Sequence, residues 1–555
     1  MKKRGFFKHY KQIFVNEFKG YNGSKFVKDI LAGLTVAAVA LPLALAFGAA
    51  SVETNPQLGI VAGMITAIFA GIIMGALGGG SFQISGPTGA MTVVLGSIVA
   101  QENGIQCMFI ACFMAGAILL IAGLLRFGKL IQFIPRPVIV GFTSGIALVI
   151  AFGQFGNFFG VAMSGKDIVT KLINVFKSAS DFNIYSIILT IIAVVIIFVF
   201  PKKWSKYVPS SLLALIVVTL ISLFFKDKVN RIGDIPATLV NSQTLSFSNI
   251  SIDTIVGLIG PAFTIAALGM IESLLCGVCA AKMKNEKFDS NVELIAQGIG
   301  NMVLPLVGGV PATAAIARTS VAIKNGGQTR ITSIMQSVFL IICMFALPSI
   351  ISIIPYAALA GVLFATAWKM NEWHTIKDYF KKKKWDAIIL FLVTLIATIL
   401  LDLTYAILIG VVLSLVIMVI NTKIQIEFSP IEKENLTNNS NIDAVIVYMT
   451  GSLFFANASE LEKQIKTVID KYDQFIFVFR GITYLDVSSI ETLTEIMQDL
   501  KSKNKQIAFT GIRESIYKKL EKDGFIQMFD KNAFYPSLDK LLLQHDKTKV
   551  YLEKE

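Results

Sequence analysis

Two short Gly/Pro interruptions within apolar sequence are the segments whose residue types and spacing could do chemistry. They are residues 85–90 (SGPTGA) and 309–315 (GVPATAA), and each opens an apolar stretch too short to cross a membrane as an ordinary helix. A helix that begins inside the membrane exposes unpaired N–H groups and the positive end of its dipole, which together attract an anion. The pair therefore predicts one anion site built from two half-helices. Pro87 and Pro311 are expected in the first helical turn, and Thr88 and Thr313 as added hydroxyl donors.

Two ionisable residues, Arg318 and Glu272, interrupt apolar stretches. A charge in a membrane segment costs several kcal/mol, so we expect each of them to have a function. For Arg318 we expect a fixed positive field on the anion or a pairing with Glu272; the alternative is an arginine that reaches the cytoplasmic interface. For Glu272 we expect binding of the driving proton or of Na⁺, and a structural ion pair is the alternative.

The composition assigns most of the chain to the membrane. Of 555 residues, 54% are apolar and only 16% are charged, whereas soluble proteins are about 25% charged. Residues 31–125 contain two charges, Glu53 and Glu102, while residues 431–555 are rich in both signs. The net charge of +13 is therefore interpreted as membrane topology and not as affinity for nucleic acid.

The few cysteines and histidines exclude other classes. Five Cys lie in apolar stretches and three His are scattered, so neither a disulfide framework, a metal site nor a cofactor is predicted. Cys276 and Cys279 have redox spacing but lie in an apolar helical run without the context that activates a thiolate. We find no phosphate-binding loop or nucleophile–base arrangement, so no enzyme is predicted. No signal peptide is evident at the start.

The apolar pattern predicts an α-helical polytopic membrane protein of fourteen segments in two sets of seven, about 29–225 and 252–427. The short segments are third in each set, and two sets of seven joined in sequence must run in opposite directions. Paired interrupted segments in inverted halves are typical of a transporter site at the membrane midplane. Basic residues concentrate in the even-numbered connections and the N-terminus, which places both termini in the cytoplasm of a cell-membrane protein. The segments are 28–50, 57–77, 86–100, 105–125, 135–158, 184–201, 209–225, 252–281, 289–307, 311–324, 329–348, 353–371, 385–402 and 403–427.

From Asp443 short apolar runs alternate with amphipathic stretches, which predicts a small soluble α/β domain. We expect a cytoplasmic N-terminal segment at 1–28, a transport domain at 29–428, a linker at 429–441 and the α/β domain at 442–555.

Five stretches of the membrane part resemble the SulP family of anion transporters. They are residues 32–47, 83–89, 272–281, 293–301 and 309–319. The resemblance implies a core domain (segments 1–4 and 8–11) that moves as an elevator against a gate domain (segments 5–7 and 12–14). It also implies that the anion binds between the third and tenth segments, at Ser85, Gly86, Pro87, Thr88, Ala314, Ala315, Ile316 and Arg318.

The resemblance places Glu272 where bacterial members carry the acidic coupling residue. Na⁺-dependent members have Asp there, with threonine hydroxyls as cation ligands. The neighbouring positions here are interpreted as Cys276 and Ile316, which offer no hard oxygen, so proton coupling is favoured.

Residues 481–489 (GITYLDVSS) resemble the strand–turn–helix signature of STAS domains, in which a serine at the position of Ser488 can be phosphorylated. Capping of a helix by Asp486 and Ser488 also explains this spacing, and we favour it.

Expected partners are a small anion, H⁺ or Na⁺, membrane lipid, a second copy of the chain in a homodimer, and a cytoplasmic protein on the STAS domain.

The leading prediction is secondary active transport of sulfate, bicarbonate or a dicarboxylate. Nucleobase–proton symport by the same architecture is an alternative, but those proteins place an acidic residue on the tenth segment, where this chain has Arg318. An anion channel or exchanger also fits the fold. A membrane anchor for a regulatory module does not, because an anchor needs one or two helices.

Overall fold

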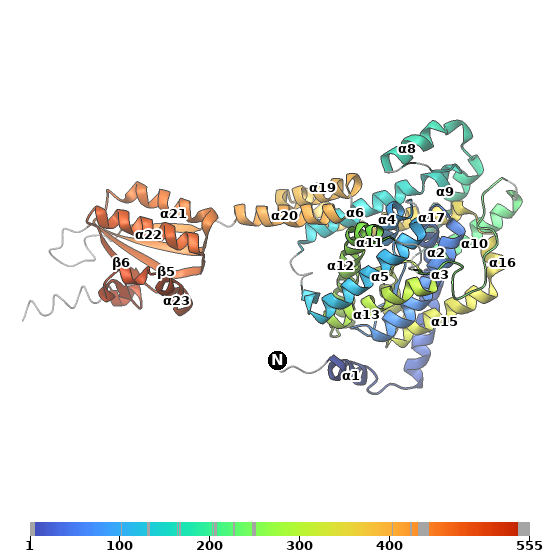
Figure 1. Cartoon of the computed structure of the whole chain (residues 1–555), viewed down its shortest axis with the longest axis horizontal. Coiled ribbons are helices and arrows are strands. Elements are labelled where there is room, and N and C mark those ends of the chain that lie inside the picture. The colour runs from blue at the N-terminus through green and yellow to red at the C-terminus, as the bar shows by residue number, and fades with distance from the viewer. Residues whose placement is uncertain are drawn as a thin grey trace, which may run out of the picture. The chain divides into compact units, whose positions relative to one another are not determined.

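The computed structural model describes residues 6–100, 103–129, 134–163, 165, 168–201, 204, 208–225, 228–246, 251–401, 403–421, 424–430 and 443–541. The chain divides into two compact units, Met1–Val412 and Leu413–Glu555. The first unit is helical and the second contains a five-stranded sheet (Figure 1).

Each of the fourteen predicted membrane segments contains a helix. Five helices in the described part of the chain are long and apolar enough to cross a membrane, and the others are shorter. The helices of the fourteen segments are α2 (Gly23–Ser51), α3 (Pro56–Leu77), α4 (Gly89–Val99), α5 (Gly104–Leu124), α6 (Arg136–Gly153), α9 (Ile184–Val199), α10 (Ser210–Ser222), α12 (Ile259–Lys284), α13 (Ser290–Val303), α14 (Ile316–Lys324), α15 (Ile331–Ala346), α17 (Tyr356–Met370), α19 (Trp385–Leu400) and α20 (Leu403–Asn421).

These helices pack in two groups. In the first group α2, α3, α4, α5, α12, α13, α14 and α15 form one connected set of contacts, and in the second α6 packs on α17 and α19 while α9 packs on α10 and α17. Small residues permit close crossings: a Cβ on Gly63 of α3 would collide with the backbone of α2 at Ala44 and Gly48. The first group contains the segments predicted for the core domain, and the second contains segments predicted for the gate.

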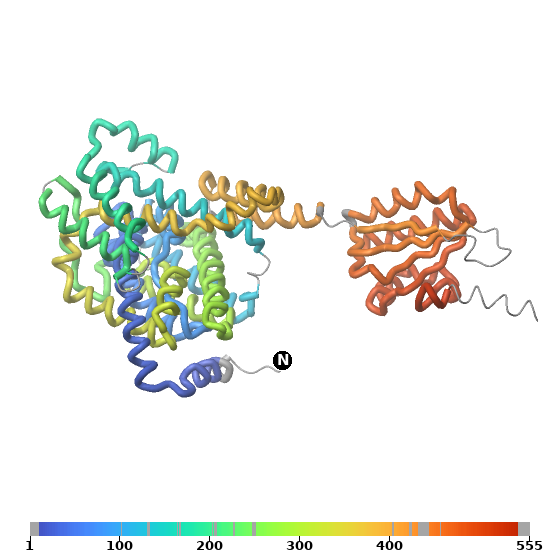
Figure 2. Tube along the Cα trace, turned by 180° about the vertical axis from the view of Figure 1, so that it is seen from behind, coloured from blue at the N-terminus to red at the C-terminus, as the bar shows by residue number. Residues whose placement is uncertain are grey.

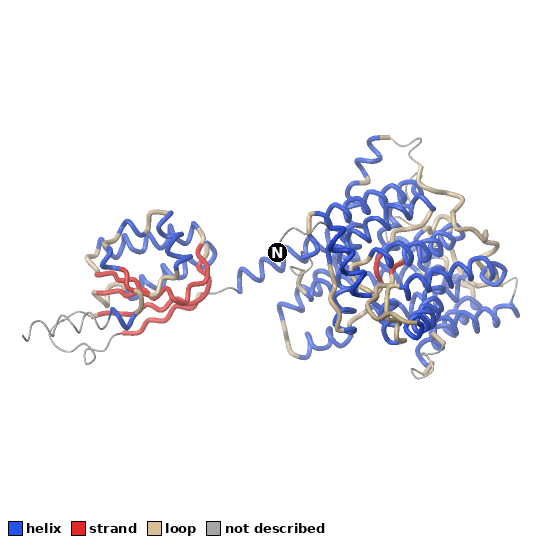
Figure 3. The backbone as a smooth tube through the Cα atoms, turned by 90° about the horizontal axis from the view of Figure 1, so that it is seen from below, coloured by secondary structure: helices blue, strands red, loops and turns tan. Residues whose placement is uncertain are grey.

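The two short segments meet in a small antiparallel pair inside the helical unit. Strand β1 (Ser85–Gly86) pairs with β2 (Thr313–Ala314), with Ser85 opposite Ala314 and Gly86 opposite Thr313. Figure 3 shows these strands in red among the helices. We call this pair the β1–β2 ribbon. It joins residues more than 200 positions apart and brings the starts of α4 and α14 together.

The ribbon corrects the prediction that each proline lies in the first turn of its half-helix. Helix α4 begins at Gly89 and α14 at Ile316, so Pro87 and Pro311 both precede the helices. The two prolines flank the strands, where a residue without an N–H is tolerated at a strand edge or end. The tenth segment is therefore helical only from Ile316, and Arg318 lies in the first turn of α14, not two turns into a helix.

Further short helices are distinct from these fourteen helices. They are α1 (Phe6–Glu17), α7 (Phe155–Phe159), α8 (Ile168–Lys177), α11 (Ile252–Gly257), α16 (Pro348–Ser352) and α18 (Trp373–Lys381). Helix α1 is held to the first unit by an ion pair of 2.7 Å between Glu17 and Arg330, both almost fully buried.

The second unit is an α/β domain, whose sheet and helices are traced in Figure 2. The strand order is β3 (Gln425–Pro430), β4 (Ala444–Leu453), β5 (Gln474–Leu485), β6 (Gln506–Thr510) and β7 (Phe534–Tyr535), with β3 antiparallel and the others parallel. Apolar residues of α21 (Phe455–Val468), α22 (Val487–Ser502) and α23 (Glu514–Lys522) share one core with the sheet.

Strand β3 corrects the predicted domain boundary. Residues 425–430 were assigned to the end of the last membrane segment and the start of the linker, yet they form a full strand paired with β4. The α/β domain therefore includes sequence before the predicted start at 442. Residues 431–441 of the predicted linker and 542–555 of the predicted domain lie outside the described residues.

Candidate functional site

The N-termini of α4 and α14 are both without a side-chain cap. Thr88 is the N-cap residue of α4 but makes no capping hydrogen bond, and α14 begins after Ala315, which has no polar side chain. A threonine at this position ordinarily accepts from the N–H groups of the first turn. Because neither helix is capped, the first-turn N–H groups of both remain available to a ligand.

Arg318 supplies a positive charge beside these helix ends. Its side chain is 1% exposed, and its Nη2 donates to the backbone carbonyl of Pro87 over 2.9 Å. Its Nε and Nη1 are buried and have no hydrogen-bond partner among the described residues. Burial excludes the alternative in which Arg318 extends to the cytoplasmic interface. Two unpaired guanidinium donors are costly unless an acceptor joins them, and an oxyanion would be such an acceptor.

Gly86 permits this position of Arg318. A Cβ at residue 86 would collide with the guanidinium group, mainly with Nη1. Glycine here is thus required by the close approach of a side chain to the backbone of β1.

Glu272 of α12 faces both halves of the ribbon region. Its Oε2 lies 2.9 Å from the Thr88 hydroxyl and 2.5 Å from the Thr313 hydroxyl. The two hydroxyls lie 3.2 Å apart. No ion pair joins Glu272 to Arg318 in the described structure. The two threonines predicted as anion donors thus contact the acid.

These contacts correct the predicted surroundings of Glu272. The Cys276 thiol donates instead to Thr319, over 3.4 Å, and the Ile316 side chain is 43% exposed. The neighbours of the acid are two hydroxyl oxygens, so the argument against Na⁺ from missing hard ligands fails. Glu272, Thr88 and Thr313 are the oxygen donors that could hold a small cation here. No group of three His, Cys, Asp or Glu side chains suited to a metal ion occurs in the described ranges.

Ser85 points to a different helix. Its Oγ accepts a hydrogen bond of 2.9 Å from Gln297 Nε2 on α13, and the Gln297 amide also donates to Glu293 Oε1 over 2.8 Å. All three side chains are buried. Sequence reasoning quoted the stretch 293–301 only for its resemblance and gave Gln297 and Glu293 no role. Their spacing of four residues on one helix face was the available signal.

The remaining predicted site residues lie at the ribbon and the start of α14. Gly86, Pro87 and Ala314 are buried, Ala315 is partly exposed and Ile316 is exposed. The Ala314 N–H donates to Ser273 Oγ of α12 over 3.1 Å, another contact that sequence reasoning missed. The structure therefore gathers all eight predicted anion-site residues and Glu272 around the ribbon.

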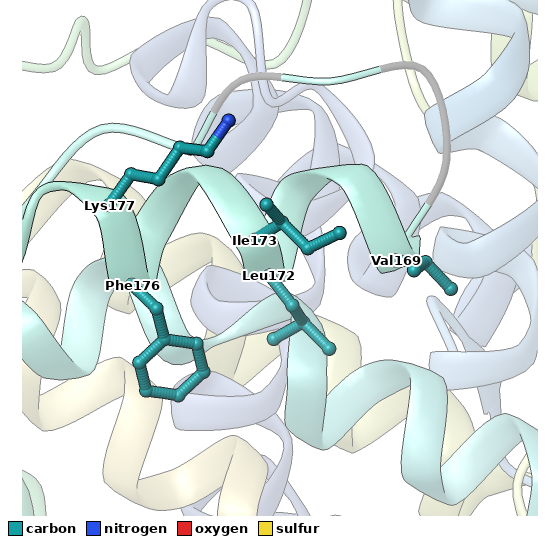
Figure 4. A pocket seen from close by; sticks show the side chains of 5 residues that line it. All are labelled: Val169, Leu172, Ile173, Phe176 and Lys177. Carbon is teal, nitrogen blue, oxygen red and sulfur yellow. The ribbon is translucent and has the colours of Figure 1, made fainter.

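A separate hollow beside α8 does not resemble an anion site. It has a volume of about 460 Å³ and is lined by Val169, Leu172, Ile173, Phe176 and Lys177 (Figure 4). Four of its five lining side chains are apolar, and these four offer no donors to an anion, which leaves Lys177 alone among the lining residues.

The STAS-like signature forms the start of α22. Asp486 is the N-cap residue, and its Oδ1 accepts from the Ser489 N–H over 2.8 Å. The Ser489 Oγ in turn accepts from the Asp486 N–H over 3.1 Å, so Ser489, not Ser488, completes the capping box. Ser488 is exposed. Capping by Asp486 is confirmed, whereas the capping role predicted for Ser488 is wrong.

Fold and site together define a polytopic membrane transport protein with a small α/β domain. The model of the sulfate permease family matches residues 26–394, and that of the STAS domain matches residues 435–541. The chain therefore belongs to the sulfate permease family, whose members are anion transporters and not enzymes.

Relatives and solved structures agree with this assignment. The chain is 34% identical to the putative sulfate transporter YvdB of Bacillus subtilis, over 95% of this chain and 99% of the relative. It is 30% identical to the bicarbonate transporter BicA of Picosynechococcus, over 89% and 90%. The murine Slc26a9 anion transporter in its inward-facing state superposes with a TM-score of 0.84 at 18% identity, over 99% of this chain and 96% of that one, and so shows the fold alone.

Proposed function

We propose that this chain is a secondary active transporter of a small anion: sulfate, bicarbonate or a dicarboxylate. The observation that carries the proposal is the pair of uncapped helix N-termini beside a buried arginine with two unpaired N–H donors. The anion would bind between the starts of α4 and α14, at Ser85, Gly86, Pro87, Thr88, Ala314, Ala315, Ile316 and Arg318. The similarity to YvdB, a putative sulfate transporter, and to BicA, a bicarbonate transporter, supports sulfate and bicarbonate as substrates.

Glu272 is the proposed coupling residue, and H⁺ is the proposed coupling ion. Among the described residues the carboxyl group has no ion-pair partner, so a bound proton would remove the cost of a charge in a membrane segment. Hydroxyl groups can donate or accept, and Thr88 and Thr313 could therefore satisfy either form of the acid. The oxygens of Glu272, Thr88 and Thr313 could also coordinate Na⁺, which is therefore the second candidate for the coupling ion.

The proposed mechanism is an elevator movement of the first helix group against the second. The anion site lies wholly on helices of the first group, which supports its movement as one body. We also place the protein in the cell membrane, as a homodimer with both termini in the cytoplasm, and propose that the STAS domain is regulatory, with Ser488 as the residue that a kinase would reach.

Uptake into proteoliposomes tests this proposal. Full-length protein would be supplied with radiolabelled sulfate, bicarbonate or succinate under one of two gradients. One is a pH gradient that drives H⁺ inward without Na⁺, and the other is an inward Na⁺ gradient at equal pH. We expect the pH gradient to drive accumulation of at least one anion. Accumulation driven by Na⁺ alone would contradict proton coupling, equilibration without accumulation would indicate a channel, and the absence of any anion flux would overturn the proposed function.

A further inference from the structure

A polar stripe on α13 faces the β1–β2 ribbon. Glu293, Gln297 and Asn301 are spaced four residues apart, which places them on one side of the helix, and each is 0% exposed. Such polar groups are costly to bury in a membrane protein unless all find partners. Neither the anion site nor the coupling site uses them.

Each residue of the stripe has a partner outside α13 or within the stripe, and the one side-chain polar atom of the stripe without a hydrogen-bond partner among the described residues is Gln297 Oε1. Asn301 donates to the carbonyl of Ala312 over 3.0 Å and accepts from its N–H over 2.8 Å, as a neighbouring strand would. Gln297 donates to Ser85 Oγ, and Glu293 accepts from the Gly79 N–H over 2.9 Å. The stripe thus connects β1, the residue before β2, and the loop after α3.

Glu293 fixes the orientation of the Gln297 amide. The Gln297 nitrogen has two hydrogens, one directed to Ser85 Oγ and one to Glu293 Oε1. A flipped amide would place its oxygen against an acceptor oxygen of Glu293, which is unfavourable. The acid therefore holds the amide in the orientation that donates to Ser85.

Ser85 lies on the side of β1 away from Arg318. Successive side chains of a strand point to opposite faces. The face of Gly86 is filled by the guanidinium of Arg318, whereas Ser85 reaches Gln297 on α13. A hydroxyl directed to α13 is placed to anchor the strand and not to contact the anion.

We propose that Glu293 and Gln297 are positioning residues and that Ser85 is their anchor point. This brace, together with Asn301, holds the ribbon at the place where Arg318 and the two helix N-termini meet the anion. The inference rests on the proposed function and changes one part of it, because Ser85 then acts through the backbone of β1 and not as a ligand.

The test compares Ser85→Ala, Gln297→Leu and the double variant in full-length protein reconstituted in proteoliposomes. Initial rates of radiolabelled sulfate uptake give KM, and competition by bicarbonate and succinate gives selectivity. We expect each single variant to raise KM about fivefold or more, the double variant to be no worse than the more severe single, and the competition ratios to stay unchanged. Gln336→Leu is the matched control, because Gln336 is equally buried but its side chain hydrogen-bonds, within the described part of the chain, only to Ala67 of α3.

Two results would overturn the brace. One is an additive effect of Ser85→Ala and Gln297→Leu on KM; the other is a change of anion preference in Ser85→Ala alone, which would make Ser85 a ligand. If Gln297→Leu does not fold, Glu293→Gln replaces it. The NH₂ group of the new glutamine would face either the Gly79 N–H or the Gln297 NH₂, both of which are donors, so this variant should reproduce the Ser85→Ala phenotype. Absence of uptake of all three anions, sulfate, bicarbonate and succinate, by the unsubstituted protein would instead contradict the proposed function.

Discussion

The two sides of the β1–β2 ribbon each carry one glutamate, partly buried on the α12 side and fully buried on the α13 side, and the two acids have different partners. On the α12 side, Glu272 is approached by two threonine hydroxyls. On the α13 side, Glu293 is approached by a backbone N–H and an amide NH₂, one at each oxygen. The first set of partners can rotate and can accept as well as donate, whereas the second can only donate.

This difference separates an acid suited to binding and releasing a coupling ion from an acid suited to holding the ribbon in place. An acid that gains and loses a proton or cation needs neighbours that adapt to both states, and hydroxyls do so. An acid whose oxygens are fixed by N–H donors suits one state and one geometry. We therefore assign ion coupling to the α12 side and positioning to the α13 side, and the following substitutions are ordered by expected effect.

Arg318→Ala should have the largest effect on transport. It removes a buried positive charge and both unpaired donors, and a hydrogen bond to a charged group contributes about 1.5–3 kcal/mol. We expect kcat/KM for sulfate uptake to fall about 100-fold. Arg136→Ala, at an exposed arginine that pairs with Glu372, is the control and should leave uptake unchanged. Undiminished uptake by Arg318→Ala would remove the arginine from the site.

Gly86→Ala should follow, with a rise in KM of about tenfold, because the added methyl group displaces the guanidinium of Arg318. Gly96→Ala, in the helix α4 that follows β1, is the control, since a Cβ there meets nothing within 4 Å. Initial uptake rates over a range of sulfate concentrations would separate KM from kcat. Equal KM values for the two variants would show that Arg318 does not depend on the glycine.

Thr313→Val should have a smaller effect, on coupling more than on binding. It removes one hydroxyl from Glu272, a change of about 1 kcal/mol, and should lower the accumulation ratio several-fold with little change in KM. Thr394→Val removes an equally buried hydroxyl that bonds only within its own helix, to Leu390, and serves as the control. A change in KM alone would place Thr313 with the anion donors.

Asp486→Ala should have the smallest effect on transport, because it lies outside both sides of the ribbon. Loss of the N-cap of α22 should lower the free energy of unfolding of the STAS domain by about 1 kcal/mol, measured by thermal denaturation of the full chain. Ser488→Ala, next to it and exposed, should change neither stability nor uptake. A marked loss of uptake in Asp486→Ala would connect the STAS domain to transport.

The membrane segments were predictable because long apolar runs, interruptions and loop charges are local signals. The ribbon was not, since a two-residue strand has no periodicity to read and its partner lies in the other half of the chain. For the same reason the sequence pointed to Pro87 and Pro311 but misplaced them in the first helical turn, whereas Pro87 lies two residues before α4 and Pro311 five residues before α14. Arg318 was identified from its charge, while its burial became visible only in the fold.

Two errors had signals that could have been used. Residues 425–430 alternate apolar and polar side chains with the period of a strand, yet they follow a long apolar helix and were divided between the end of the transport domain and the linker. The spacing of Glu293, Gln297 and Asn301 was a helical stripe of polar residues. The partners of Glu272 carried no such signal, because Thr88 and Thr313 come from different halves.

Accumulation of sulfate under a pH gradient, measured side by side for Glu272→Gln and Glu293→Gln, tests the assignment of coupling most directly. We predict that Glu272→Gln exchanges internal for external sulfate but does not accumulate it against its gradient. Glu293→Gln should still accumulate sulfate, with a raised KM. Accumulation by Glu272→Gln, or its loss only in Glu293→Gln, would contradict the account.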